Sequence, residues 1–197
     1  RDPIPVRSIS MERKVYSLKK FGRRLGTRQE GKRAHDELFR ALAALPPGGR
    51  LVIDLSGMEV LSGSFADEAL ASLLSELRDG EISDRYLLVR ADDEELLEDL
   101  SERLSRRGLA LLALVGDGHR VLGKLPPYLA EALEQVIERG RLTSLELAKL
   151  LGISVQNASV RLRELAKLRL IRMVQESRPV GGVQYRAVSL VSLKRPS

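Results

Sequence analysis

The chain has 197 residues and 43% of them are hydrophobic, which is enough to fill one or two cores. It contains no Cys, which excludes disulfides and thiolate metal sites and leads us to expect a cytoplasmic protein. No apolar run approaches the roughly 18 residues that a membrane span requires, and no signal-peptide pattern opens the chain, so we expect no membrane partner.

The net charge of +6 is distributed unevenly along the chain. Residues 1–33 hold 11 basic and 3 acidic side chains, residues 34–125 hold 10 and 18, and residues 126–197 hold 12 and 6. A basic block at one end suits a partner rich in phosphate, because phosphate contacts dominate such affinity. The basic residues that begin in the leader 1–13 either extend a nucleic-acid footprint, bind the acidic middle of the same or a neighbouring subunit, or form a solvated face.

Strands and helices alternate in the pattern up to residue 122. A first helix is expected from Thr27, where Glu30 completes a capping box, to about residue 44. The later predicted elements are strand 51–56, helix 64–80, strand 85–90, helix 92–108 and strand 109–116. This order predicts an α/β domain over 14–122, with helices around a mixed sheet that is at least partly parallel.

A second domain is predicted after the linker 123–127, because Pro126 and Pro127 cannot continue a strand ladder or a helix interior. Residues 128–197 are expected to form three helices and a β-hairpin. The helices run over 128–139, 144–151 and 155–168, and the strands over 170–177 and 183–190. Thr143 with Glu146, and later Ser154, supply caps, and Gly152 ends the middle helix. The tight turn before Ser154 predicts a helix-turn-helix, and the hairpin takes the position of a wing.

The third of these helices has two distinct faces. At 100° per residue, Ala158, Leu162 and Leu165 share one side, which we expect to be buried. The opposite side carries Gln156, Val160, Arg163 and Lys167, with Ser159 on one edge and Asn157 and Glu164 on the other. An α-helix fits the major groove of B-DNA and reads base edges with its N-terminal residues, so this side predicts a reading helix.

Each polar type on this side suits a particular contact. Gln156 and Asn157 can pair with adenine, Val160 can touch a thymine methyl group, and Arg163 and Lys167 suit phosphates. The residues predicted to contact double-stranded DNA are Thr143, Ser144, Ser154, Gln156, Asn157, Ser159, Val160, Arg163, Lys167 and Arg178. The alternative interpretation is a solvated amphipathic helix with ordinary surface arginines, or a winged helix that docks protein.

The segment "LTSLELAKLLGISVQNASVRLRELAKLRLI" (142–171) and the hairpin after it resemble the winged helix-turn-helix of bacterial transcription regulators of the ArsR and MarR groups. This resemblance covers about the last 70 residues. It implies a homodimer that binds a two-fold operator, with the wing tip, here Arg178, over the minor groove or a phosphate.

The segment "LVIDLSGMEVLSGSFADEAL" (51–70) resembles the STAS domain of anti-sigma factor antagonists, and more closely a STAS-like family without an assigned function. The similarity spans about 14–120 and includes "FGRRLGTRQEGKR" (21–33). In the antagonists a phosphorylatable Ser stands at the position of Gly63, so the kinase switch does not carry over unchanged. Ser64 is then a candidate phospho-acceptor, and Ser62 or Ser64 is otherwise an N-cap that pairs with Asp67.

We expect no enzyme, no cofactor and no metal. His35 and His119 stand in no metal-binding spacing, and no phosphate-binding Gly-rich loop follows a strand. The sequence therefore predicts a DNA-binding transcription regulator whose STAS-like domain senses a partner or ligand or drives assembly. The alternative is a signalling adaptor in which the STAS-like domain engages a kinase or regulator and the winged helix docks protein. RNA binding is disfavoured because only 4% of residues are aromatic.

Overall fold

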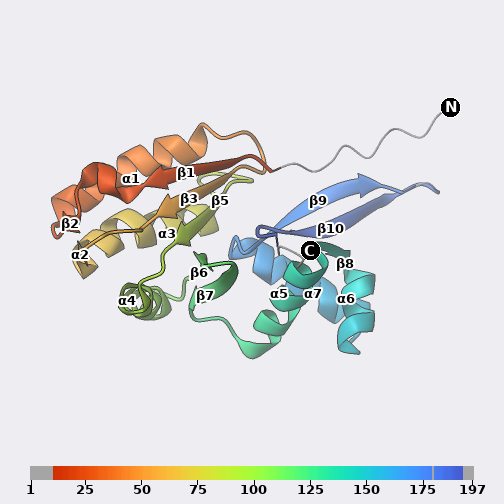
Figure 1. Cartoon of the computed structure of the whole chain (residues 1–197). Helices are drawn as coiled ribbons and strands as arrows, with labels where there is room; N and C mark the ends of the chain where they lie inside the picture. Colours follow the sequence, from red (N-terminus) through yellow and green to blue (C-terminus); the bar gives the residue numbers. More distant parts are fainter. Residues whose placement is uncertain (1–10, 179, 193–197) are drawn as a thin grey trace.

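The structure is a computed structural model that describes residues 11–178 and 180–192; residues 1–10 of the predicted leader lie outside this part. An α/β module comes first (Figure 1). Its strands are β1 (Arg13–Ser17), β2 (Arg24–Leu25), β3 (Arg50–Asp54), β4 (Val60–Leu61), β5 (Tyr86–Arg90), β6 (Ala110–Val115) and β7 (Gly118–Gly123). Its helices are α1 (Arg28–Ala43), α2 (Gly63–Ala66), α3 (Ser72–Asp79) and α4 (Glu94–Arg106), with a 3₁₀ turn at Leu18–Phe21 and a π-helical turn at Asp67–Ala71.

The main sheet has the strand order β1-β3-β5-β6-β7. The first three pairings are parallel and β6 pairs with β7 antiparallel, so the prediction of a mixed α/β layer is confirmed. Neither β1 nor β7 was predicted from the sequence pattern. Both are edge strands with few buried side chains, so neither carries an apolar run.

Alternate residues of the central strands enter two different cores. Leu51 and Ile53 pack with α1 to α4, whereas Val52, between them, packs with the C-terminal helices. On β5, likewise, Leu87 packs with α1 to α4, and Leu88 packs with the C-terminal helices. The sheet is therefore buried on both faces, which explains why its central strands are continuous runs of apolar residues. Figure 1 shows α1 to α4 on one side of the molecule and the C-terminal elements on the other.

The helix expected over 64–80 begins one residue earlier and is not uniform. It consists of α2, the π-helical turn and α3, and it ends at Gly80 in the left-handed conformation (φ 86°). The Ser72 hydroxyl donates to the Asp67 carbonyl at 3.0 Å within the widened turn. The capping box of Thr27 and Glu30 at the start of α1 is present as predicted.

The C-terminal module has the predicted helix-turn-helix and wing. Its elements are α5 (Pro127–Arg139), β8 (Arg141–Thr143), α6 (Ser144–Leu151), α7 (Val155–Lys167), β9 (Ile171–Ser177) and β10 (Val183–Ser189). Thr143 and Glu146 form a capping box, and Gly152 ends α6 with φ 65°. The short strand β8, which the sequence did not indicate, pairs with β10 and completes a three-stranded sheet of order β8-β10-β9.

Two arginines connect the C-terminal module to the α/β module. Arg172 donates from Nε and Nη2 to the two carboxylate oxygens of Asp84, each at 3.0 Å. Arg169 donates to the carbonyls of Leu77 and Ile82 at 3.0 and 3.2 Å. Together with the shared apolar core, these bonds fix the winged helix against the sheet. In the part of the chain that the structure describes, no helix is long and apolar enough to cross a membrane.

Candidate nucleic-acid interface

The buried side of α7 is the one that its periodicity predicts. Ala158, Leu162 and Leu165 are all fully buried, and they belong to the core that contains α5, α6 and the sheet face. Ser154 caps the helix by accepting the backbone N–H of Asn157 at 3.1 Å. Packing on one side and a cap at the start therefore fix which side chains of α7 face outward.

The opposite side of α7 is open to solvent. Gln156, Arg163 and Lys167 are exposed, Val160 is 37% exposed, and Ser159 is half-buried at the edge. Within the described part of the chain, the side chains of Gln156, Arg163 and Lys167 make no hydrogen bond or ion pair. The α/β module packs behind this helix and leaves its polar side uncovered. The predicted reading surface is thus available to a partner.

Arg161 has a structural role that the sequence did not reveal. Its Nε donates to Asn157 Oδ1 at 3.0 Å, and its Nη1 lies 3.2 Å from both the Tyr128 carbonyl and a Glu131 carboxylate oxygen. The guanidinium also lies over the Tyr128 ring, 5.6 Å from its centroid. The side chain therefore ties α7 to α5. It also uses one of the two acceptor positions of Asn157 Oδ1, so that the second position and the amide N–H groups of Asn157 remain for a base.

A groove of about 500 Å³ separates the start of α6, α7 and the wing. Five of the residues predicted to contact DNA line it: Thr143, Ser144, Ser159, Arg163 and Arg178. The sequence did not identify the apolar part of the lining, which consists of Leu145, Val155, Met173, Val183 and Tyr185. The period-two pattern of the wing strand was the available signal, since Val183 and Tyr185 point to the same face.

The two predicted threonine and serine caps are engaged with backbone. The Thr143 hydroxyl accepts the backbone N–H of Glu146 at 3.2 Å, and the Ser154 hydroxyl accepts the backbone N–H of Asn157 at 3.1 Å. Ser144 forms no side-chain bond in the described chain and lines the groove. Thr143 and Ser154 therefore act first as helix caps, with only their remaining hydrogen-bonding capacity open to a ligand.

Much of the basic charge of the C-terminal part is used inside the fold. Arg172 pairs with Asp84, Arg186 with Glu176 at 2.9 Å, and Arg161 with Glu131. Glu131 and Glu176 are already counted among the six acidic residues of 126–197, so only the pair between Arg172 and Asp84 lowers the surplus of positive charge in this part of the chain. Six cations of the described C-terminal part are exposed and form no ion pair within it: Arg139, Arg141, Lys149, Arg163, Lys167 and Arg178. Arg163 and Lys167 lie on α7, and Arg178 follows the first strand of the wing.

The second candidate site lies at the start of α2, where the Ser62 hydroxyl is hydrogen-bonded to backbone groups of the same module. Ser62 is the N-cap: its hydroxyl accepts from Phe65 N at 3.2 Å and donates to the Gly26 carbonyl at 2.7 Å. Asp67 does not complete a capping box, because the N-cap is Ser62 and the third helical position is therefore Phe65. The Asp67 carboxylate lies 3.9 Å from Arg103. A Cβ added at Gly63 would lie 1.8 Å from the guanidinium carbon of Arg103. Ser64 is exposed.

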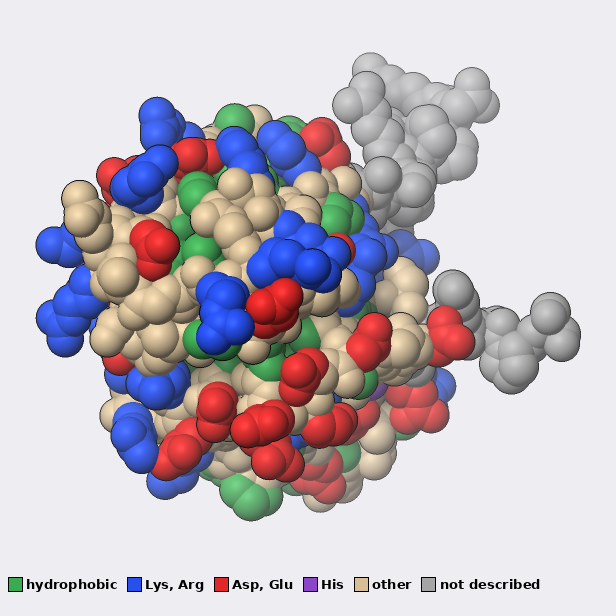
Figure 2. Space-filling view, turned by 60° about the vertical axis from the view of Figure 1, so that its left-hand side comes forward, with side chains coloured by type: hydrophobic (Ala, Val, Ile, Leu, Met, Phe, Trp, Pro, Cys, Tyr) green, Lys and Arg blue, Asp and Glu red, His purple; other side chains and the backbone are tan. Residues whose placement is uncertain are grey.

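The basic residues near the N-terminus pair with acidic residues of the same module. Lys20 lies 2.7 Å from Glu37, Arg24 lies 3.4 Å from Glu59, and Arg28 lies 3.9 Å from Glu68. Figure 2 shows basic side chains along the upper and left parts of this side of the molecule and acidic ones gathered in its lower part. These ion pairs agree with binding to the acidic middle of the same subunit, and the high exposure of Lys20, Arg24 and Arg28 agrees equally with a solvated face.

No cluster of three or more His, Asp or Glu side chains that could hold a metal ion occurs among the described residues. The two histidines each face carboxylates: His35 Nε2 lies 2.7 Å from Glu76, and His119 Nε2 lies 3.2 Å from Glu134.

Residues 131–172 match the family model of winged helix-turn-helix DNA-binding domains. The match runs from α5 through β8, α6 and α7 into β9, so it covers the elements that position the open face of α7. No curated protein matches the chain. A solved structure described as a possible transcriptional regulator from Methanosarcina mazei Go1 is similar over 34% of this chain and 57% of that chain, with 14% identity and a TM-score of 0.32. The chain thus spans less than two thirds of that protein, and the predicted winged helix-turn-helix is confirmed by the family match and the fold.

Proposed function

We propose that this protein is a transcription regulator whose helix α7 reads duplex DNA in the major groove. The observation that supports the proposal is the open polar side of α7, on which Gln156, Arg163 and Lys167 make no bond within the described chain. In this proposal Gln156 and the amide of Asn157 read base edges, and Val160 meets a thymine methyl group. Arg163 and Lys167 contact phosphates, and Arg178 on the wing holds the neighbouring backbone.

The proposal also assigns a role to the α/β module. We propose that it is a STAS-like domain, as its sequence resemblance implies, which senses a partner or ligand or drives assembly. Because Arg172 and Arg169 connect the two modules, a change in the α/β module would alter the placement of α7. One reading helix covers a short site, so the regulator is proposed to act as a homodimer on a two-fold operator.

Selection of bound sequences from a random duplex library tests this proposal. A regulator of this kind enriches one motif with two-fold symmetry, with half-sites about 10 base pairs apart or a multiple of that. Enrichment of a single half-site would contradict the dimer, and a pool without any enriched motif would contradict sequence reading by α7.

The groove favours a second candidate function, a signalling adaptor. Leu145, Val183 and Tyr185 are 52%, 49% and 57% exposed, and apolar exposure of this kind is typical of a protein interface. In this alternative the winged helix docks a protein, and the STAS-like domain engages a kinase or regulator. Failure of the chain to bind any duplex at about 50 mM salt, where phosphate contacts are strongest, together with capture of a kinase would favour it.

A further inference from the structure

A second cavity, of about 360 Å³, lies between the main sheet and the segment that follows β10. Three arginines of the sheet line it, Arg13 on β1, Arg50 on β3 and Arg90 on β5. Its remaining wall includes the apolar side chains of Val52, Leu88 and Leu190. A volume of this size is at the lower end of the range of about 300–1,000 Å³ that small-molecule sites occupy.

The strand register fixes how the arginines are spread. Arg13 lies directly opposite Arg50, and Arg90 lies opposite Asp54, four residues further along β3. At about 3.3 Å per residue, this separates the backbone positions of Arg50 and Arg90 by about 13 Å along the strands. Val52 and Leu88 occupy the middle row. The cavity thus has an apolar floor with guanidinium groups toward both ends.

The positive charge in the cavity is only partly compensated. Arg13 and Arg90 form no ion pair within the described chain. Arg50 donates to the carbonyls of Leu190 and Met11, and its Nε is buried without a partner among the described residues. Burial, followed by the positive charge of Arg13, lowers the pKa of the Arg50 guanidinium. One carboxylate, Asp117, belongs to the lining.

We infer that this cavity binds a small organic anion with two or more carboxylate or phosphate groups. Guanidinium groups bind both kinds of oxyanion through paired N–H donors, and two separated arginine positions select a ligand that carries acid groups at both ends. The apolar floor accommodates the carbon skeleton between these groups.

The cavity lies where the main sheet meets the segment after β10, so a bound ligand should affect the contact between the two modules. Arg50 joins the main sheet to Leu190, directly after the last strand of the winged helix. An anion held by Arg13 and Arg50 neutralises the two adjacent cations and stabilises the contact between the modules. Ligand binding therefore raises the melting temperature of the whole chain, because a ligand that binds only the folded state stabilises it.

Calorimetric titration of the full chain tests the inference with three probes, citrate, 3-phosphoglycerate and inorganic phosphate, at constant ionic strength. We expect one site per chain for citrate or 3-phosphoglycerate and weaker binding of inorganic phosphate. Arg13→Gln and Arg90→Gln should each weaken binding of the organic anion about tenfold or more, because each removes a charged hydrogen-bond donor. Arg50→Gln is a poorer test, since it also removes the contacts with Leu190 and Met11.

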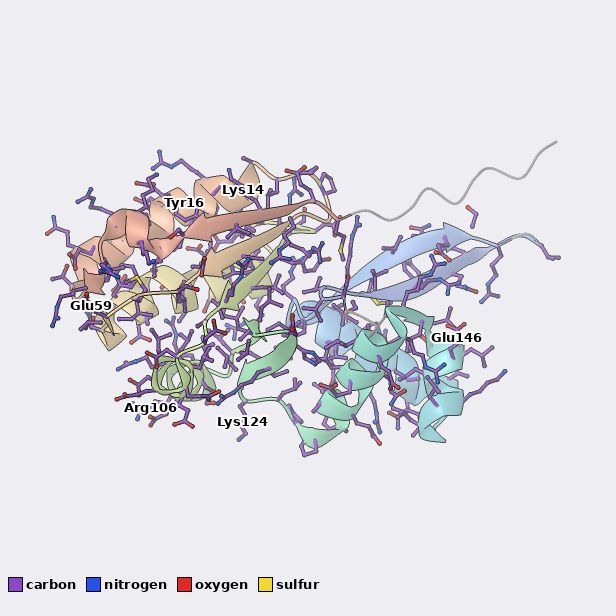
Figure 3. All side chains as sticks on the ribbon, viewed as in Figure 1. Lys14, Tyr16, Glu59, Arg106, Lys124 and Glu146 are labelled. Carbon is purple, nitrogen blue, oxygen red and sulfur yellow. The ribbon has the colours of Figure 1, made fainter. Side chains whose placement is uncertain are left out.

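Lys14→Gln is the matched control. Lys14 follows Arg13 on the same strand and is exposed, and Figure 3 places it with Tyr16 on the side of β1 next to α1. It should bind the anion like the parent. Absence of binding by all three probes at about 10 mM, or equal weakening by Lys14→Gln, would overturn the inference. The titration contains no DNA, so its outcome is independent of the proposed reading of duplex DNA by α7.

Discussion

The first turns of α2 and α7 are built alike and have different surroundings. Each follows a serine whose hydroxyl accepts the backbone N–H three residues later, Ser62 from Phe65 at 3.2 Å and Ser154 from Asn157 at 3.1 Å. At that third helical position, Phe65 is fully buried whereas Asn157 is exposed. The cap pattern specifies where a helix begins, and tertiary packing decides whether its start is open to a partner.

The side chains around each start show the same contrast. At α2, Ser62 also donates to Gly26, and the Arg103 guanidinium lies where a side chain at Gly63 would stand. At α7, the Gln156 side chain makes no bond within the described chain. The start of α2 is therefore part of the fold, and the start of α7 is a surface. Four predictions, made with five substitutions and one control, test this distinction.

Phe65→Ala should have the largest effect, because it removes a fully buried aromatic side chain from the α2 start. We expect a loss of about 3–5 kcal/mol in the free energy of unfolding, measured by denaturant titration. Gln156→Ala, at the second position of α7, should change it by less than about 0.5 kcal/mol. Similar losses for the two variants would remove the distinction between a structural and an open helix start.

Gln156→Ala should instead change sequence choice. A bidentate pair between glutamine and adenine contributes about 1–3 kcal/mol of discrimination against other bases. We expect the variant to lose this preference at one position of the selected operator, measured by competition between operators that differ at single base pairs. Unchanged discrimination at every position would exclude Gln156 from base reading.

Arg163→Ala should weaken binding to all duplexes about tenfold and reduce the slope of log affinity against log salt by about 1. The exposed guanidinium is proposed to contact a phosphate, which carries no sequence information. Arg106→Ala is the control, since Arg106 is exposed on α4 and pairs with Glu102. The assignment fails if Arg163→Ala keeps the parent's salt slope or if Arg106→Ala lowers it as much.

Ser62→Ala and Ser154→Ala should have the smallest effects. Loss of an N-cap costs about 0.5–2 kcal/mol of stability. We expect Ser62→Ala to cost more than Ser154→Ala, because the Ser62 hydroxyl also bonds to the Gly26 carbonyl. Thermal unfolding of the two variants gives the order, and a larger loss for Ser154→Ala would show that the α7 cap has partners beyond Asn157.

Local patterns allowed most elements and the two faces of α7 to be predicted. Capping boxes at Thr27 and Thr143, and the spacing of Leu162 and Leu165, depend on residues three or four positions apart. Contacts between distant residues left no such signal. Arg172 meets Asp84 across 88 positions and Arg50 meets Leu190 across 140, so neither the docking of the winged helix nor the arginine-lined cavity was predictable.

The central claim is that the open side of α7 lies in the DNA major groove. The chain contains no Cys, so Val160→Cys creates a single thiol on that side, to which an iron–EDTA cleavage reagent can be attached. Glu98→Cys, on the exposed side of α4, is the matched control. We predict cleavage of the selected duplex confined to a few base pairs within each half-site from Val160→Cys and no localised cleavage from Glu98→Cys. A complex that forms normally but is cut only from Glu98→Cys, or from neither position, would contradict the account.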